Sequence, residues 1–381
     1  MSDTQKHTKP NVPNLRFPGL KGEWKQYTMG EITELFSRRN KNRTDYPMFS
    51  VTNARGFVNQ QEQFEDREMK GEDISAYKIV SPGEFAYNPA RINVGSIARY
   101  DGETDCMISS LYVCFKAKTE LVDSQLLLHI LKSPKMVYNY GINGEGGVRI
   151  YLFYPNFSRI RVKLPSLEEQ RKIASFLDLI EERIQIQNKV IEKYESLIKA
   201  LYRQLIPEDG DEHAALGTLV QICKGKQLNG EYLSDNGKYY VMNGGITPSG
   251  YYDDYNTSAG TISISEGGNS CGFVQYNEAP FWSGGHCYTL LQTSNERIQY
   301  KFLYHFLKSK QEEIMSLRIG SGLPNIQKKD LGSYPVPILP YNYQIVITKI
   351  LDAVCQHIEI ERVILDGITL QKQYFLQALF I

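Results

Sequence analysis

The sequence predicts an α+β protein in which two β-rich globular domains are separated by two long antiparallel coiled-coil helices. The segment LPSLEEQRKIASFLDLIEERIQ (164–185) has a counterpart in LPYNYQIVITKILDAVCQHIEI (339–360), and their glutamines Gln170 and Gln344 are 174 residues apart. Each segment opens a long run with a seven-residue apolar repeat. Short strand patterns separated by turn residues precede each run, so the chain carries an internal pseudo-twofold repeat.

Length and charge bound the class of protein. The chain has 381 residues, more than one domain usually contains, and its 43 basic and 43 acidic residues give a net charge of zero. The chain as a whole therefore has no net charge to attract a nucleic acid or a membrane, and either partner must bind to local patches of charge. The six cysteines form no C-x-x-C pair, which favours reduced, buried thiols in a cytosolic protein over a metal site. No stretch has the length of a membrane span, so we expect a cytoplasmic protein without a membrane partner.

The two domains are predicted over residues 1–163 and 207–338. Strand patterns bounded by Gly, Asn and Asp run through both. They are PMFSVTNA, GEFAYNPA, VGSIARY and SLYVCFKA in the first domain, and GTISISE, CGFVQY and CYTLLQT in the second. The repeat extends into the domains, since LLLHILKS (126–133) matches LYHFLKSK (303–310). We expect two antiparallel β bodies, each with a helix or two, that share a plan but present different loops.

A spacer helix follows each domain, over residues 164–206 and 339–381. Pro165 and Pro340 mark the start of the helices. Apolar residues recur in alternating steps of four and three, which is the a/d seam of a coiled coil and is more regular than a lone surface helix needs. At 1.5 Å per residue, about 38 residues give a helix about 57 Å long.

The seam predicts how the helices pack. Its residues include Ile173, Leu177, Ile184 and Gln187 in the first helix, and Ile358, Glu361 and Leu365 in the second. Gln187 and Glu361 are polar residues at the equivalent place in each seam, where such a group commonly fixes register at some cost in stability. We expect antiparallel packing, with Ile173 near Leu379 and Leu205 near Ile347, because a pseudo-twofold relation that puts one domain at each end of the helices demands it. The alternative is two unrelated surface helices.

Basic and amide residues gather in the turns of both domains. SRRNKNR (37–43) carries four cations and no acid. Lys and Arg neutralise phosphates, Arg reads guanine, and Asn or Gln reads adenine in the major groove of duplex DNA. The candidate DNA-binding residues are Arg38, Arg39, Lys41, Arg43, Arg55, Arg91, Arg149, Lys224, Lys226, Asn243, Arg318, Asn325, Lys328 and Lys329. The alternative is a set of ordinary solvated loops, because scattered Arg and Asn residues occur on most proteins.

The sequence offers no complete catalytic motif. GEGG and GSGLPN lack the Lys-Ser/Thr of a phosphate-binding loop. YNPAR (87–91) resembles the Asn-Pro-Pro-aromatic motif of amino-methyltransferases, but Ala90 and Arg91 replace its last two residues. His286-Cys287 has no signalled acid partner, and a strand cysteine is more often part of a core. We expect a chain that is not an enzyme and that holds no cofactor and no metal.

Three features of the sequence carry a resemblance to a known family. They are FPGLKGEWKQYTMGEI (17–32), the paired LPSLEEQRKIASFLD and LPYNYQIVITKILD segments, and the duplicated domain plan. With them the chain resembles, over nearly its whole length, the specificity subunit of type I restriction-modification enzymes. The resemblance implies that residues 1–163 and 207–338 are target-recognition domains, each reading half of a bipartite site in double-stranded DNA.

The resemblance also implies partners. Two methyltransferase subunits would dock on the helices, and two motor-nuclease subunits would join them. S-adenosylmethionine, ATP and Mg would then belong to those subunits and not to this chain. Two rival classes stay open on the residues alone. One is a non-enzymatic coiled-coil adaptor whose β segments bind protein or glycan, and the other is a stand-alone methyltransferase, which needs a cofactor site that the sequence does not show.

Overall fold

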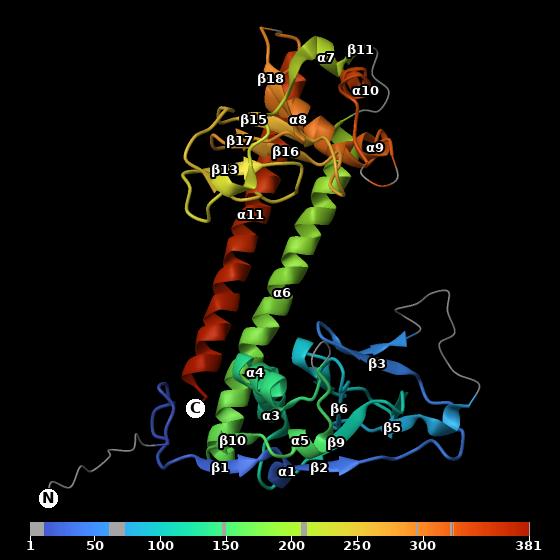
Figure 1. The fold of residues 1–381 in the computed structure, drawn as a ribbon, viewed down its shortest axis with the longest axis vertical. Helices are drawn as coiled ribbons and strands as arrows, with labels where there is room; N and C mark the ends of the chain where they lie inside the picture. The colour runs from blue at the N-terminus through green and yellow to red at the C-terminus, as the bar shows by residue number, and fades with distance from the viewer. Residues whose placement is uncertain are drawn as a thin grey trace, which may run out of the picture. The chain divides into compact units, whose positions relative to one another are not determined.

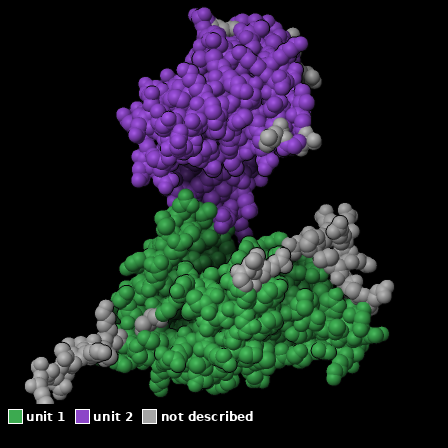
Figure 2. All heavy atoms as spheres, viewed as in Figure 1, with its two compact units in different colours: residues 1–186, 365–381 green, residues 187–364 purple. Residues whose placement is uncertain are grey.

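The computed structural model describes residues 11–60, 73–146, 150–206, 212–294, 296–320, 322 and 324–380. The chain divides into two compact units, shown in Figure 2. The first unit is Met1–Ile186 with Leu365–Ile381, and the second is Gln187–Ile364. Each unit therefore contains part of each long helix together with its own set of β-sheets. The division into two domains and two spacer helices stays a prediction, because these units do not separate the helices from the sheets.

Both units contain the same four-stranded antiparallel sheet. Its strand order is β2-β9-β6-β7 in the first unit and β12-β18-β15-β16 in the second. The strands are Thr33–Phe36 (β2), Val113–Ala117 (β9), Phe85–Tyr87 (β6) and Ile97–Arg99 (β7), then Val220–Lys224 (β12), Cys287–Gln292 (β18), Thr261–Ser265 (β15) and Val274–Asn277 (β16). The predicted internal repeat is confirmed, and each of the seven runs predicted as strands contains one.

Smaller elements complete each unit. β1 (Lys25–Thr28) pairs with β10 (Arg161–Leu164), and β11 (His213–Ala215) pairs with β19 (Pro335–Pro337), so that a paired strand precedes each long helix. The other strands are β3 (Phe49–Thr52), β4 (Gly56–Asn59), β5 (Lys78–Val80), β8 (Cys106–Ile108), β13 (Tyr239–Met242), β14 (Tyr251–Tyr252) and β17 (Trp282–Ser283). The short helices are α1 (Met29–Ile32), α4 (Pro134–Asn143), α5 (Tyr154–Phe157), α7 (Leu216–Leu219), α9 (Gln311–Ser316) and α10 (Lys328–Gly332), with single turns η1 (Ile74–Ala76), η2 (Ile92–Val94) and η3 (Gly230–Tyr232).

One amphipathic helix joins the sheet to the long helices in each unit. These are α3 (Ser124–Lys132) and α8 (Tyr300–Ser309), which contain the matched sequences LLLHILK and LYHFLKS. The side chain of Asp123 caps α3 and that of Gln299 caps α8, each accepting a hydrogen bond from a backbone N–H of the first turn. The apolar residues of both helices are buried in the core of their unit, together with residues of the sheet and of the long helices.

The long helices are α6 (Leu167–Leu205, 39 residues) and α11 (Tyr341–Ala378, 38 residues). Both follow a proline by two residues or fewer, as the sequence predicts. Glu168 and Glu169 lie in the first turn of α6, where their negative charges interact favourably with the positive end of the helix dipole. Among the described residues, no helix is long and apolar enough to cross a membrane.

The long helices run antiparallel within each unit (Figure 1). In the first unit the rings of Phe176 and Phe375 meet edge to face at 4.8 Å between centroids, and Lys372 pairs with Glu181. In the second unit Gln187 bonds to Glu361, and the ring of Tyr194 stacks on that of His357 at 5.7 Å. Residue numbers rise along α6 as they fall along α11, which confirms the predicted direction.

The seam residues predicted from the sequence are buried or half-buried. Ile173, Leu177 and Ile358 are buried, and Ile184, Gln187, Glu361 and Leu365 are half-buried. Ile173 and Leu379 share the core of the first unit. Ile347 lies in the core of the second unit, and Leu205 packs against it. The predicted fold class is confirmed.

Candidate nucleic-acid interface

Five loops of the second unit converge at one end of its sheet, where β12 and β15 finish and β18 begins. They are residues 224–227, 243–245, 266–268, 283–286 and 324–327. Backbone hydrogen bonds join them: the N–H of Lys226 donates to Ser283, and the N–H of Gly268 donates to Pro324. Loops at the end of a rigid sheet are where binding residues commonly lie. This loop cluster is the candidate interface of the second unit.

Glu266 lies at the centre of the loop cluster. Its side chain accepts a hydrogen bond from Lys224 Nζ at 2.5 Å and from the Tyr288 hydroxyl at 3.4 Å. Oε2 lies 3.6 Å from His286 Nδ1 and has no hydrogen-bond partner among the described residues. The backbone of Glu266 accepts from the N–H of Ile326 at 2.9 Å. The carboxylate of Glu266 therefore meets side chains from two other loops and from β18, and its backbone carbonyl binds a third loop.

Glycine allows the loops to approach so closely. A Cβ on Gly284 would lie 2.5 Å from Asn243 Oδ1, and one on Gly285 would lie 2.4 Å from Gln227 Oε1. Such distances are shorter than van der Waals contact, so a larger residue would push the amide side chains away. Asn243 Oδ1 also accepts a hydrogen bond from the backbone N–H of His286 at 3.2 Å. The Gly-Gly pair thus positions two amide side chains.

Four predicted residues of the second domain are brought to this loop cluster, and three lie on neighbouring segments. Those within it are Lys224, Lys226, Asn243 and Asn325, and those on the segments that flank Asn325 are Arg318, Lys328 and Lys329. Asn325 pairs with Gly267 through the backbone, and its Oδ1 accepts from Gln327 Nε2 at 3.1 Å. Lys226 is exposed, and its carbonyl oxygen accepts from Trp282 Nε1 at 2.9 Å. Cationic and amide groups therefore share one surface.

The first unit has an equivalent loop arrangement with different side chains. The N–H of Leu152 donates to the carbonyl oxygen of Pro89 at 3.0 Å, just as that of Ile326 donates to Glu266 at 2.9 Å. Pro89, one residue beyond Asn88, thus takes the place of Glu266. The apolar ring cannot hold cations together as the carboxylate does, so the two units offer different chemistry at the same position of one scaffold.

Aromatic rings replace amides in the first unit. The backbone of Tyr151 pairs with Glu145, as that of Asn325 pairs with Ile319. Tyr151 and Phe153 are 39% and 50% exposed and stack at 6.2 Å between ring centroids. Exposed rings of this kind can stack on bases or pack against sugars.

Two predicted arginines of the first domain come from loops that touch. Gly95 lies against Asn53, so that a Cβ added to it would be 3.4 Å from the Cβ of Asn53. Arg55 follows Asn53 on the same turn, and Arg91 precedes the η2 turn that Gly95 ends. Both arginines are exposed. Arg149 lies outside the described residues.

The basic segment SRRNKNR is partly neutralised by acids from elsewhere in the chain. Arg38 pairs with Glu84, and Arg43 lies 3.5 Å from Asp73. Asn40 is buried and bonds to the backbone of Thr44, so it holds the segment's shape. The remaining cations of the segment, also exposed, are Arg39 and Lys41.

Sequence reasoning missed several residues of these surfaces. They are Glu266 and His286 in the second unit, and Tyr151 and Phe153 in the first. The available signals were the short runs YLFY (151–154), EGG (266–268) and SGGH (283–286), but none of the three is specific. Other chemistry finds little support here: burial raises the pKa of the Cys287 thiol to about 11, the opposite of what a nucleophile needs. Within the described ranges, no three His, Cys, Asp or Glu side chains are grouped to hold a metal.

Comparison with known proteins gives one consistent family. The model of the type I restriction modification DNA specificity domain matches residues 21–196 and 209–370. A putative type I specificity subunit from Mycoplasma pneumoniae is 40% identical over 124 residues, which are 32% of this chain and 33% of that protein. This chain thus matches about a third of the length of that relative. A putative MjaX specificity subunit from Methanocaldococcus jannaschii is 21% identical and aligns over 94% of this chain and 93% of its own length.

Solved structures show the same fold. The S subunit of a type I restriction-modification system from M. genitalium superposes with a TM-score of 0.68 at 19% identity, covering 97% of this chain and 99% of that one. A chain from a study of complex assembly in the type I R-M system gives a TM-score of 0.55 at 16% identity, covering 93% and 96%. Because the family model matches well over half of the sequence, the chain belongs to the type I restriction modification DNA specificity family.

Proposed function

We propose that this chain reads a bipartite asymmetric site in double-stranded DNA, one half with each unit, as the specificity subunit of a type I restriction-modification complex. One observation carries the proposal. Each unit has its own four-stranded sheet of the same topology, with loops at equivalent positions. These loops present a buried carboxylate with amides in the second unit, and a proline with aromatic rings in the first. A common scaffold with different reading groups suits two different half-sites.

The chemistry of the loops supports DNA as the ligand. Exposed lysines and arginines neutralise phosphates, while Asn325 and Gln327 offer amide groups that can pair with adenine. Lys224 and Lys226 lie in the same loop cluster as these amides, so contacts to the DNA backbone and to its bases can form together. Because the net charge is zero, an attraction to DNA must come from local groups such as these.

The long helices offer a surface for partner subunits. Apolar residues remain exposed one position before the seam on both helices. They are Leu179, Ile186 and Leu197 in α6, and Val346, Ile350, Ile360, Ile364 and Tyr374 in α11. Ile186 and Ile360 are 174 residues apart, so this one pair occupies equivalent positions of the internal repeat. Exposed apolar stripes mark protein interfaces, so these residues are the candidate contact surface for partner subunits.

We assign the stripe to two methyltransferase subunits, with two motor-nuclease subunits joining the complex in the cytoplasm. The chain itself catalyses no step, and S-adenosylmethionine, ATP and Mg act in the partners. The isolated chain is therefore expected to transfer no labelled methyl group to DNA, and the chain with its methyltransferase is expected to do so. Methyl transfer by the partner-free chain would contradict this assignment.

Methylome sequencing tests the proposal directly. Cells carrying the chain and its methyltransferase are expected to gain modified adenines in one asymmetric two-part sequence with a fixed spacer. Cells carrying the methyltransferase alone are the control and should lack these sites. Purified complex should bind such a site in a way that weakens steeply with salt but survives competitor DNA. Modified sites with a single uninterrupted sequence, or none at all, would count against two readers.

A further inference from the structure

Each long helix is joined near its N-terminus to the rest of one unit by a buried glutamine. Gln170 is 1% exposed, and its amide nitrogen donates to the carbonyl oxygens of Leu121 and Pro165, both at 3.0 Å. Its oxygen accepts from the backbone N–H of Asp123 at 2.8 Å. Gln170 therefore joins the start of α6 to the residues that lead into α3.

The second glutamine repeats these contacts. Gln344 is 0% exposed and donates to Arg297 at 2.9 Å and to Leu339 at 2.7 Å. Its oxygen accepts from the backbone N–H of Gln299 at 2.7 Å. Asp123 and Gln299 are the residues that cap α3 and α8, so both glutamines bind the same point of the repeat.

An aspartate two turns along each long helix adds a second grip. Asp178 Oδ1 lies 2.5 Å from Gln125 Nε2 and 2.7 Å from His129 Nε2, both on α3. Asp352 Oδ1 lies 2.8 Å from His305 Nε2 on α8, and its Oδ2 lies 3.4 Å from Lys301 Nζ. We call Gln170 with Asp178 the first clasp, and Gln344 with Asp352 the second clasp.

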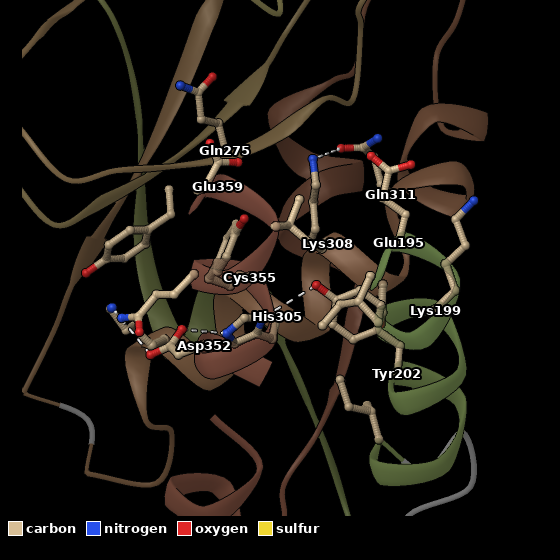
Figure 3. Close-up of a pocket in the computed structure, with 18 of the residues that line it drawn as sticks. Glu195, Lys199, Tyr202, Gln275, His305, Lys308, Gln311, Asp352, Cys355 and Glu359 are labelled. Carbon is tan, nitrogen blue, oxygen red and sulfur yellow. Dashed lines mark hydrogen bonds and ion pairs between the residues drawn. The ribbon is translucent and has the colours of Figure 1, made fainter. Parts of the chain in front are cut away.

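The second clasp also reaches the other long helix. Figure 3 shows His305 between Asp352 of α11 and Tyr202 of α6, on the wall of a cavity of about 1260 Å³ in the second unit. The Tyr202 hydroxyl lies 3.5 Å from His305 Nδ1. In the repeat, Leu376 occupies the position of Tyr202, so the first clasp lacks this extension.

We propose that both clasps are positioning devices that fix each sheet on its own long helix and thereby fix the spacer that the chain accepts between its half-sites. The inference rests on the proposed DNA-reading function. α3 and α8 pack on the sheet that carries the reading loops, so a shift of either helix along the long helix carries those loops with it.

Hydrogen bonds can fix a position that apolar packing leaves adjustable. Apolar burial is non-directional, whereas a buried amide with three backbone partners fits only one register. A spacer changed by one base pair moves a half-site by about 3.4 Å along the DNA and turns it by about 34°. Intact clasps oppose that shift, because sliding would leave buried polar groups without partners.

The test replaces both glutamines with methionine, which keeps length and volume but cannot form the bonds. Gln170→Met with Gln344→Met is expressed with the methyltransferase, and methylated sites are read across the genome. Native half-sites with a spacer one base pair shorter or longer are expected to rise about tenfold relative to the native spacer. The matched control is Gln185→Met with Gln371→Met, because both glutamines are exposed on the same two helices. It should leave the spacer preference unchanged.

Each outcome decides between explanations. Lower methylation at every site with an unchanged spacer preference would show that the glutamines only stabilise the fold, and would overturn the proposal, as would altered half-site sequences. If the variant does not accumulate, Asp178→Leu with Asp352→Leu, which removes the acceptor oxygens from both side chains at similar size, replaces it with the same expected direction. If the unmodified chain itself directs methylation to no bipartite site, the proposed function fails instead.

Discussion

Gln187 and Glu361 are equivalent residues of the internal repeat and are bonded to each other. Gln187 Nε2 donates to the carbonyl oxygen of Glu361 at 3.0 Å and also contacts its carboxylate. In an antiparallel pair of equivalent helices, a residue meets its own counterpart only at the centre of the repeat. The polar group in each seam therefore marks that centre, and a slip by one heptad would separate the two groups.

The Gln187–Glu361 contact is expected to set the register of α6 against α11 and to add little to the free energy of unfolding. Gln187→Leu should lower the free energy of unfolding by about 1–2 kcal/mol, because Glu361 loses its partner. Adding Glu361→Leu should recover that loss or exceed it, since two leucines complete the apolar seam. Urea unfolding of both variants measures the coupling. The Glu361→Leu single variant completes the cycle, and a double-variant loss equal to the sum of the two single losses would argue against an interaction between the two residues.

Acid is expected to weaken both units through two buried histidines. Desolvation by burial lowers the pKa of His129 and His305, although each lies beside an aspartate that opposes the shift. Below about pH 6.5 the histidines of the unfolded chain therefore bind more protons than those of the folded chain. The free energy of unfolding is at its full value above that pH and falls as the pH drops below it.

Replacing the histidines tests this sign. His129→Asn with His305→Asn should reduce the difference in melting temperature between pH 7.5 and pH 5.5, at equal ionic strength. His213→Asn is the control, because His213 is exposed on β11. A steeper loss of stability in acid for the double variant would reverse the proposed sign.

Specificity is expected to separate by unit. Asn325→Ala should cost about 1–3 kcal/mol at one position of one half-site, if its amide reads a base. Lys226→Ala should weaken binding to all sequences alike and reduce the salt slope by about 1, if its amine contacts a phosphate. Arg55→Ala and Arg91→Ala should act on the other half-site. Methylome sequencing of each variant shows which half changes, and a first-unit substitution that shifts the second half-site would refute independent reading.

Longer helices are expected to lengthen the spacer. Seven residues added to both α6 and α11 extend each helix by about 10.5 Å and return the seam nearly to its starting face. At about 3.4 Å per base pair, the spacer should grow by about three base pairs while both half-sites stay the same. The added base pairs also turn one half-site by about 100°, so activity is expected to fall. An active variant with the original spacer would show that the helices do not set the distance.

Local patterns were enough to predict the helices and the sheet strands. The seam depends on an apolar repeat of 3.5 residues that keeps one face of each long helix against the other, and Ile173, Leu177 and Ile358 are buried for that reason. The antiparallel direction was predicted from the repeat together with the assumption that one domain lies at each end of the helices. Strand patterns are local as well, so the runs around Phe85 and Ile262 were identified without knowledge of their partners.

The sequence alone determined the repeat, the long helices and their register, whereas the tertiary structure decided which side chains act together. Glu266 meets Lys224 across 42 residues, and Arg38 meets Glu84 across 46. Gln170 was visible as a landmark of the repeat, but its bonds to Leu121 and Asp123 were not. Period and propensity act over a few neighbouring residues, while loop contacts depend on how the sheets and helices pack, which no local pattern encodes.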